Sequence, residues 1–315
     1  MKLILAGPGA FGIKHLDALQ AIDGVEIACI VDADLCHAEA VARRYKISDA
    51  QTDIGLALRR PDIDAVILAT PTPLHAAQAI LCMKAGKHVA VEIPLAENWQ
   101  DVKEIVKVQK ETDLICMVGH TRRYNPSHQW MHNRIIAGEI SIQHLDVQTF
   151  FFRRTNTNAL GQPRAWTDHL MWHHAAHTID LFLHQTGERI IEMNVMQGPV
   201  NPELGIAMDM SIQMKSQSGK LLTLALSFNN DGPLGTVFRY ICDNGTYIAS
   251  YDDLHTASGD AIDVSGVDVS TNGILLQGLD FISAIRNGTQ PRACITNVLP
   301  CYEVLNILDR KLQAQ

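Results

Sequence analysis

The chain has 315 residues, of which 47% are hydrophobic and 19% are charged, and its formal net charge is -8 at pH 7. This length is sufficient for two domains with separate cores. The negative charge argues against nucleic acid or an anionic membrane as a general partner. No apolar run of the sequence reaches the roughly 20 residues that a membrane-spanning helix needs.

The cysteines indicate a compartment. Seven are scattered along the chain, at positions 29, 36, 82, 116, 242, 294 and 301, and no two form a C-x-x-C pair. Scattered thiols of this kind are typical of a reducing environment, and the segment before the first glycine is too short for a signal peptide. We therefore expect a cytoplasmic protein.

Residues 1–32 predict a strand, a glycine loop, a helix, a second strand and an acidic residue, in that order. The glycines follow the pattern G-x-G-x-x-G, and Asp32 comes twenty residues after the last of them. In this setting the glycines permit a tight turn, close approach of the backbone to a pyrophosphate, and close packing of helix on strand. An ordinary strand-to-helix turn is the alternative. The residues predicted to bind the dinucleotide here are Gly7, Gly9, Ala10, Phe11 and Gly12.

Asp32 favours NAD over NADP. Its carboxylate can accept hydrogen bonds from the ribose hydroxyls of NAD, whereas the 2′-phosphate of NADP would meet a like charge. No arginine stands in residues 32–34 to neutralise that charge. Arg43 and Arg44 lie further along the next helix, so NADP remains the alternative cofactor.

The segment after Asp32 continues the alternation of helices and strands. The expected elements are helices over about 35–45 and 98–111, a helix ending at Gly86, and apolar strands at 65–69, 87–91 and 114–118. This order predicts a doubly wound parallel sheet, a Rossmann domain over residues 1–122. Ligands of such sheets bind at the carboxyl ends of the strands. The further cofactor contacts predicted there are Thr70, Pro71, Thr72, His75, Glu92, Ile93, Pro94 and His120.

From about residue 125 the hydrophobic pattern changes to a two-residue alternation, and Asp243–Thr246 is a hairpin-turn signal. We expect an α+β domain over residues 123–295 with a large, mostly antiparallel open sheet. A helix over about 296–315 is expected to pack back on the first domain. The small residues Thr223, Ala225 and Ser227 on the opposite face of the sheet suit a partner sheet, so we expect a homo-oligomer, namely a dimer.

A histidine-rich segment, residues 164–180, contains candidates for chemistry. On a helix, His169, His173 and His177 would be spaced four apart and share one face. Three hypotheses compete: hydrogen-bonded histidines on a polar helix face, a metal site, and a general base beside a nicotinamide. Because the H-E-x-x-H pattern is missing and the cofactor motif is present, we expect a base and no metal.

Arginines are concentrated between residues 117 and 165, where six of them stand against only two acidic residues. A guanidinium binds a carboxylate bidentately, so this excess favours an anionic substrate; solvated sheet edges are the alternative. No cysteine lies in an obvious catalytic setting, which argues against a thioester mechanism. We expect oxidation of an alcohol-like carbon, and an aldehyde substrate would be presented as a hydrate or hemiacetal.

These motifs resemble the glucose-fructose oxidoreductase and inositol dehydrogenase family over the whole chain. The segments that carry the resemblance are the glycine loop, residues 69–75, 87–94 and 119–126, and His173–Asp180. The resemblance implies a Rossmann domain followed by an α/β domain whose open sheet covers the active site and often forms the dimer contact. It also implies a proton-transferring Lys in Glu-Lys-Pro and an Asp-x-x-x-His motif. Here Ile93 replaces that Lys and His173 replaces that Asp, while His177 is retained.

One subgroup of the family, which acts in aromatic catabolism, resembles this chain more closely. Its members oxidise the cyclic hemiacetal of a dicarboxylate semialdehyde with NAD or NADP, in agreement with the arginine excess and with the missing catalytic cysteine. The resemblance implies that His177 removes the hydroxyl proton and that His173 binds a carboxylate or tunes His177. The substrate contacts so implied are Arg122, Arg123, Arg164, Asp168, His174, Asn229, Asn230 and Arg239. A sugar or polyol dehydrogenase of the same fold and a non-catalytic nucleotide-binding sensor are the alternatives.

Overall fold

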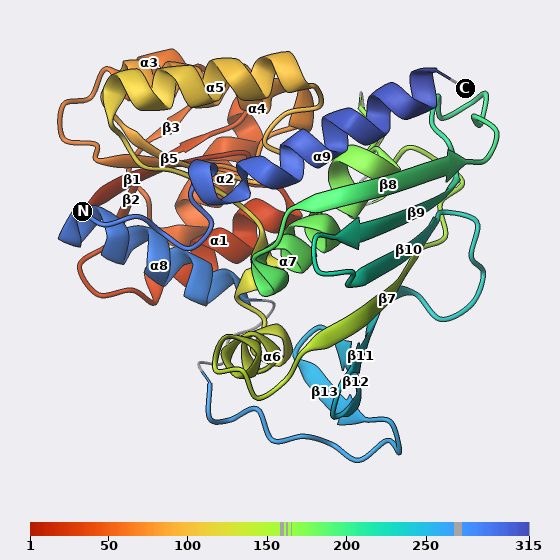
Figure 1. The fold of residues 1–315 in the computed structure, drawn as a ribbon. Coiled ribbons are helices and arrows are strands. Elements are labelled where there is room, and N and C mark those ends of the chain that lie inside the picture. Colours follow the sequence, from red (N-terminus) through yellow and green to blue (C-terminus); the bar gives the residue numbers. More distant parts are fainter. Residues whose placement is uncertain (158–160, 162, 165, 268–272, 315) are drawn as a thin grey trace. The chain divides into compact units, whose positions relative to one another are not determined.

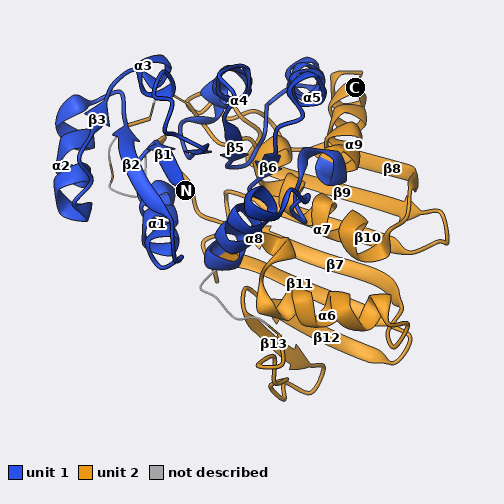
Figure 2. Ribbon diagram, turned by 90° about the vertical axis from the view of Figure 1, so that its left-hand side faces the viewer, with its two compact units in different colours: residues 1–120, 274–298 blue, residues 121–273, 299–315 orange. Residues whose placement is uncertain are grey.

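The computed structural model describes residues 1–157, 161, 163–164, 166–267 and 273–314 (Figure 1). By compactness the chain divides into two units (Figure 2). The first comprises Met1–His120 and Ile274–Val298, and the second comprises Thr121–Gly273 and the chain from Leu299 onward. The domain boundaries expected from the sequence, 1–122 and 123–295, stay a prediction. The compact units differ from them because residues 274–298 group with the start of the chain. The chain from Leu299 onward groups with the second unit, although its helix was expected to pack on the first domain.

The first unit alternates strands and helices as the sequence predicts. Its strands are β1 (Lys2–Ala6), β2 (Glu26–Val31), β3 (Ala50–Gln51), β4 (Ala65–Leu68), β5 (His88–Val91) and β6 (Cys116–Val118). Its helices are α1 (Ala10–Gln20), α2 (Leu35–Tyr45), α3 (Ile54–Leu58), α4 (His75–Lys84), α5 (Trp99–Thr112) and α8 (Ile274–Asn287), with a 3-10 turn η1 (Thr72–Leu74) before α4.

Among the described residues, the strands of the first unit form a parallel sheet in the order β3-β2-β1-β4-β5-β6. Helices α3, α4 and α5 cover one face, and α1 and α8 lie on the other (Figures 1 and 2). The central strand β4 is buried over its whole length because both faces are covered. This strand order is that of dinucleotide-binding sheets and confirms the predicted fold.

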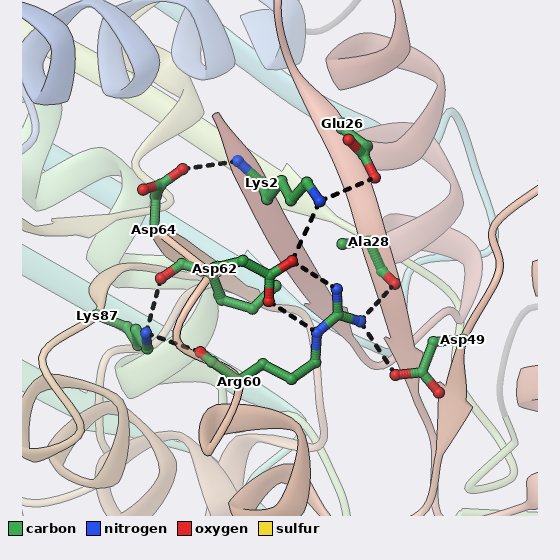
Figure 3. Close-up of polar contacts among 9 residues, drawn as sticks. Lys2, Glu26, Ala28, Asp49, Arg60, Asp62, Asp64 and Lys87 are labelled. Carbon is green, nitrogen blue, oxygen red and sulfur yellow. Dashed lines mark hydrogen bonds and ion pairs between the residues drawn. The ribbon is translucent and has the colours of Figure 1, made fainter.

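A polar network at the amino-terminal edge of this sheet fastens the loop before β4 (Figure 3). The Arg60 guanidinium donates to the Ala28 carbonyl oxygen at 3.1 Å and to the carboxylates of Asp49 at 3.2 Å and Asp62 at 3.0 Å. The Arg60 carbonyl oxygen accepts in turn from the buried Lys87 ammonium at 3.1 Å. The edge opposite to the cofactor motifs is thus held by charge-assisted hydrogen bonds.

The second unit contains the other described elements. Its helices are η2 (Thr121–Arg123, a 3-10 turn), α6 (Pro126–Ile136), η3 (Leu170–Ala175, a π-helix) and α7 (Ala176–Thr186), and α9 (Ile295–Gln313) spans both units. Its strands are β7 (Ile142–Phe150), β8 (Ile190–Gln197), β9 (Asp209–Ser216), β10 (Leu221–Ser227), β11 (Gly235–Cys242), β12 (Gly245–Ser250) and β13 (Asp253–Thr256).

The strands of the second unit form an open sheet, described in the order β13-β12-β11-β7-β10-β9-β8. Among the described strand pairs of this second sheet, only β7–β10 is parallel, which confirms the mostly antiparallel sheet. Side chains of the central strand β7 alternate: Leu145 and Val147 are fully buried, and their neighbours point to the other face. Helix α7 contacts this strand. None of the described helices has the length and apolar character needed to cross a membrane.

Replacing Arg60 with Ala should lower the free energy of unfolding by about 2 kcal/mol, because three acceptors lose a charged donor. Urea unfolding of the two proteins measures this difference. Arg43→Ala is the matched control, since Arg43 forms an exposed pair with Glu39 and such pairs contribute less than about 1 kcal/mol. Equal losses in both variants would contradict a structural role for the Arg60 network.

Candidate active site

The glycine loop has the geometry that the sequence predicts. Gly7 has a φ of +87° and donates its N–H to the Val31 carbonyl oxygen at 2.9 Å. A Cβ on Gly12 would lie 2.0 Å from the Gly7 carbonyl oxygen, so only glycine lets α1 pack this closely on the loop. A Cβ on Gly9, by contrast, would meet no described atom within 4 Å. The open space at Gly9 leaves room for a ligand against the backbone.

The start of α1 fits an anion. Gly9 occupies the N-cap position without a side-chain hydrogen bond, and the described first turn of the helix carries no acidic residue. Its free N–H groups and the helix dipole therefore favour a negatively charged group such as a pyrophosphate. Ala10 and Phe11 are exposed beside this position, and Phe11 has 54% of its surface accessible.

Asp32 follows β2 and carries polar contacts of its own. One carboxylate oxygen accepts the N–H of Asp34 at 2.8 Å, and the other lies 3.0 Å from Nδ1 of His37. The Asp34 side chain caps α2 by accepting the N–H groups of Cys36 and His37. Asp32 is thus oriented at the carboxyl end of the sheet, where the ribose of a dinucleotide binds.

His75 joins the loops that follow β4 and β5. Its ring nitrogens lie 2.8 Å from the carbonyl oxygens of Thr70 and Pro94, and the side chain is buried. Burial lowers the pKa of His75, so a neutral ring donates to one of these oxygens at a time. Pro71 and the buried Thr72 lie in the same turn, and a buried His120 follows β6. The predicted cofactor residues of these loops therefore surround the carboxyl ends of neighbouring strands.

Glu92 is a carboxylate held by a histidine. Its Oε1 lies 2.6 Å from Nε2 of His15 on α1. Burial alone would raise the pKa of Glu92, but the hydrogen bond and charge of His15 outweigh it, and the pKa stays below its ordinary value. The next residue, Ile93, is buried and apolar. No amine is available at this position, where the resembling family has its Lys.

The histidine segment differs from the predicted α-helix. The helix begins at Leu170 as a π-helix, η3, and becomes the α-helix α7 only at Ala176. His169 is the N-cap residue, and its ring accepts the N–H of Met171 at 3.1 Å. The prediction that His169, His173 and His177 share one helix face is therefore wrong for His169, which lies before the first turn of the helix. π-Helical turns are rare in proteins, and those that occur frequently lie at functional sites.

Asp168 is a buried carboxylate between two arginines. Its Oδ2 accepts from Arg153 at 2.5 Å and from Arg164 at 3.3 Å, and its Oδ1 lies 4.0 Å from Nδ1 of His173. Burial would raise the pKa of Asp168, but the charges of His173, Arg153 and Arg164 lower it to about 2. Asp168 is therefore anionic. We predicted that it contacts the substrate directly, whereas in the structure it binds the guanidinium groups of Arg153 and Arg164.

Arg153 was not singled out as a site residue from the sequence. Its guanidinium lies 4.5 Å from the ring centroid of Phe228, and its NH1 is buried without a hydrogen-bond partner among the described residues. Nε of Arg164 is in the same situation, with the guanidinium 4.6 Å from the ring of Trp166. Both arginines thus keep donors that an anion could satisfy. Their spacing in the sequence gave no sign that both contact Asp168.

Arg122 is the third cation with spare donors. Its guanidinium lies 4.9 Å from the ring centroid of Tyr251 and 5.6 Å from that of Phe238. NH1 reaches Oδ1 of Asn125 at 3.5 Å, and Nε is buried with no acceptor in the described part of the chain. Burial lowers the pKa of Arg122, although arginine remains charged at any physiological pH. Such a desolvated guanidinium favours an anionic ligand.

Arg123 and Arg239 occupy other environments. Arg123 forms a bidentate pair with Asp180 at 2.7 and 2.8 Å, and both side chains are almost completely buried. Its guanidinium is engaged in holding η2 to α7. Arg239 is exposed and alternates with the buried Phe238 and Tyr240 along β11, so it lies on the sheet face opposite to Arg122. The structure gives neither residue the geometry expected of a substrate contact.

The remaining predicted contacts have partners or burial of their own. The Asn229 amide donates to Asp209 at 2.6 Å and accepts from Arg154 at 3.0 Å, and the Asn230 amide donates to the Pro233 carbonyl oxygen at 2.9 Å. His174 packs between Phe151 and Phe228, and burial holds its pKa well below the ordinary value. No three His, Cys, Asp or Glu side chains of the described residues form a group suited to a metal ion.

Two family models match the chain. Residues 1–120 match the description "Oxidoreductase family, NAD-binding Rossmann fold". Residues 126–268 match the description "Bacterial oxidoreductases, C-terminal". The first model matches the amino-terminal part of the first compact unit, and the second matches most of residues 121–273 of the second unit.

Individual proteins are similar as well. The 4-carboxy-2-hydroxymuconate-6-semialdehyde dehydrogenase of Sphingobium sp. (strain NBRC 103272 / SYK-6) is 61% identical over 315 residues, which is the full length of both chains. The NAD-dependent scyllo-inositol 2-dehydrogenase of Bacillus subtilis (strain 168) is 36% identical over 44% of this chain and 41% of its own. A crystal structure of an Agrobacterium radiobacter oxidoreductase with NAD+, L-tartaric acid and magnesium has a TM-score of 0.84 at 18% identity, over 99% of this chain and 96% of that one. This last likeness concerns the fold.

Ala at Gly9 should leave the fold intact and weaken NAD binding by about tenfold or more, because the added methyl group fills space that a pyrophosphate needs. Ala at Gly12 should instead destabilise the fold by about 3 kcal/mol, because its Cβ would collide with a backbone carbonyl. Thermal unfolding and calorimetric titration with NAD separate the two effects. A Gly9→Ala variant that binds NAD like the wild type would place the cofactor elsewhere.

Proposed function

Since the chain belongs to the oxidoreductase family with an NAD-binding Rossmann fold, we propose that it oxidises the cyclic hemiacetal of 4-carboxy-2-hydroxymuconate-6-semialdehyde to 2-pyrone-4,6-dicarboxylate. This reaction would be a step of protocatechuate 4,5-cleavage. The observation that carries the proposal is the 61% identity, over the full length of both chains, to a dehydrogenase named for that semialdehyde.

The cation cluster of the second unit supports a dicarboxylate substrate. We define this cluster as Arg122, Arg153 and Arg164, each of which has a buried N–H group without a hydrogen-bond partner among the described residues. Asp168 pairs with Arg153 and Arg164, and Asp252 acts on Arg122 only at longer range. The two carboxylates of the substrate would balance the remaining positive charge, and bidentate pairing would orient the ring.

His177 is the proposed base of the reaction. It removes the proton of the hemiacetal hydroxyl while the ring carbon loses a hydride, so that the C–OH carbon becomes the lactone carbonyl and two electrons leave with the hydride. Bound NAD or NADP supplies the hydride acceptor. A hemiacetal hydroxyl is more acidic than that of a simple alcohol, so one base suffices although Ile93 replaces the family Lys.

The alternative functions are less well supported. The Bacillus inositol dehydrogenase matches 44% of this chain, and a polyol has no negative charge to pair with the cation cluster. A nucleotide-binding sensor would need no base and no anion site in the second unit. Either alternative would leave the buried donors of the cation cluster unexplained.

Cofactor, assembly and compartment complete the proposal. The open space at Gly9 suits the pyrophosphate of either dinucleotide, and the placement of Asp32 supports NAD. NADP is the alternative cofactor, because His37 contacts Asp32. Thr223, Ala225 and Ser227 are half-buried on the sheet face opposite to the buried Leu222 and Leu224. We propose that this face pairs with a second copy in a homodimer. All seven cysteines are free thiols, which supports a cytoplasmic location.

Replacing His177 with Ala should lower turnover of the hemiacetal by about a hundredfold or more, the usual effect of losing a general base. The assay follows reduced nicotinamide by its absorbance with the freshly formed semialdehyde as substrate. Nucleotide affinity should not change in the variant, which separates a chemical defect from misfolding. Unchanged turnover would remove His177 from the mechanism and leave His173 as the candidate.

Replacing Arg122 with Ala should raise the KM for the dicarboxylate by about tenfold or more and change kcat little, because a carboxylate contact stabilises the ground state and the transition state alike. Arg43→Ala, an exposed arginine of the first unit, serves as the control and should leave both constants unchanged. A fall confined to kcat would show that Arg122 acts in the chemical step.

A further inference from the structure

The contact between His37 and Asp32 bears on cofactor choice. His37 lies in the first turn of α2, and its Nδ1 is 3.0 Å from the Asp32 carboxylate. The side chain of His37 is 43% exposed and that of Asp32 is 21% exposed, so both are accessible to a bound nucleotide. An imidazole ring therefore sits directly beside the carboxylate that should receive the ribose.

This arrangement changes the electrostatics of a 2′-phosphate. Asp32 alone would repel the phosphate of NADP, and the usual remedy is a nearby arginine. Arg43 and Arg44 do not fill this role: Arg43 pairs with Glu39, and the Arg44 guanidinium lies 5.3 Å from the ring of Tyr45. Both stand in the last turn of α2, about 12 Å along the axis from its start.

Two of the backbone N–H groups at the start of α2 are already engaged. The N–H groups of Cys36 and His37 already point at the Asp34 carboxylate. The charged groups of the neighbouring segments are Asp32 and Asp34 before the helix and the Glu39–Arg43 pair within it; Asp49, beside β3, is bound to Arg60. An imidazole is a side chain whose charge changes near neutral pH, and His37 is the histidine that contacts Asp32.

We propose that His37 is a specificity-determining residue for the cofactor. When protonated, it neutralises Asp32 and provides a cation for the 2′-phosphate, so that the site takes NADP as well as NAD. When neutral, it leaves the Asp32 charge uncompensated, and the site prefers NAD. The inference rests on the proposed nucleotide site of the first unit and is independent of the identity of the substrate.

The test measures the dissociation constants of NAD and NADP by calorimetry at pH 6 and pH 8, without substrate. For the wild-type protein, the ratio of NADP affinity to NAD affinity should be about three- to fivefold higher at pH 6, the scale of a partly exposed ion pair. His37→Gln keeps a donor toward Asp32 but cannot acquire a charge, so its ratio should lack this increase. Ionisation of the 2′-phosphate itself is common to both proteins and cancels in the comparison.

Two further variants complete the design. His37→Arg carries a permanent charge and should raise NADP affinity at pH 8 by a similar factor, about three- to fivefold. His255→Gln, on β13 of the second unit, is the control and should behave like the wild type. The same pH dependence in His37→Gln as in the wild type would overturn the proposal. Failure of the wild type to bind either nucleotide would instead refute the nucleotide site itself.

Discussion

A single buried carboxylate, Asp168, determines the arrangement of the proposed substrate site. It joins Arg153, which follows β7, to Arg164 and to the start of the π-helix segment that carries His173. An unpaired charge at this depth would be unstable, so the carboxylate requires both guanidinium groups. Arg153 and Arg164 together still exceed it by one charge, and each keeps a buried N–H group that has no hydrogen-bond partner in the described part of the chain. Asp168 thus holds the two arginines in place, and their remaining positive charge is available to a carboxylate of the proposed substrate.

The first unit shows how much local sequence can predict. The spacing of the glycines, the apolar strands and the acid at position 32 were sufficient to predict the parallel sheet and the alternation of its strands and helices. The glycine loop itself depends on contacts within about 30 residues, such as that between Gly7 and Val31, and on the backbone freedom of glycine. The sheet also needs longer-range pairs, such as that between β1 and β4, and the alternation predicts these through the general rule for doubly wound sheets. At Gly12 the constraint is purely steric, because a Cβ there would stand 2.0 Å from a carbonyl oxygen.

The second unit was less predictable for physical reasons. The four-residue spacing of histidines suggests an α-helix, but the first turns adopt π-helical hydrogen bonding and leave His169 as a cap. Which arginines are available depends on long-range pairing: Asp180 binds Arg123, 57 residues away. Arg239 was placed with the substrate although strand alternation along β11 directs it to the other face. Counting charges along the sequence locates the excess of arginines, whereas tertiary contacts determine which of these arginines can still bind a ligand.

The chemistry and the fold are consistent at the position of the missing Lys. Ile93 is buried between Glu92, which His15 holds as a carboxylate, and Pro94, whose carbonyl oxygen lies against His75. These contacts keep the cofactor loops in place without an amine. In the proposed mechanism, proton transfer then depends on a histidine of the second unit, and a single base of this kind suits a substrate whose hydroxyl is acidic, as in a hemiacetal.

The most direct test of this account is a comparison of substrates with the purified wild-type protein. Nicotinamide reduction would be followed with the freshly generated 4-carboxy-2-hydroxymuconate-6-semialdehyde and, in parallel, with myo- and scyllo-inositol. The account predicts rapid reduction with the dicarboxylate, formation of the pyrone dicarboxylate as product, and no comparable rate with either inositol. Reduction with an inositol and none with the dicarboxylate, from protein that binds the nucleotide, would contradict it.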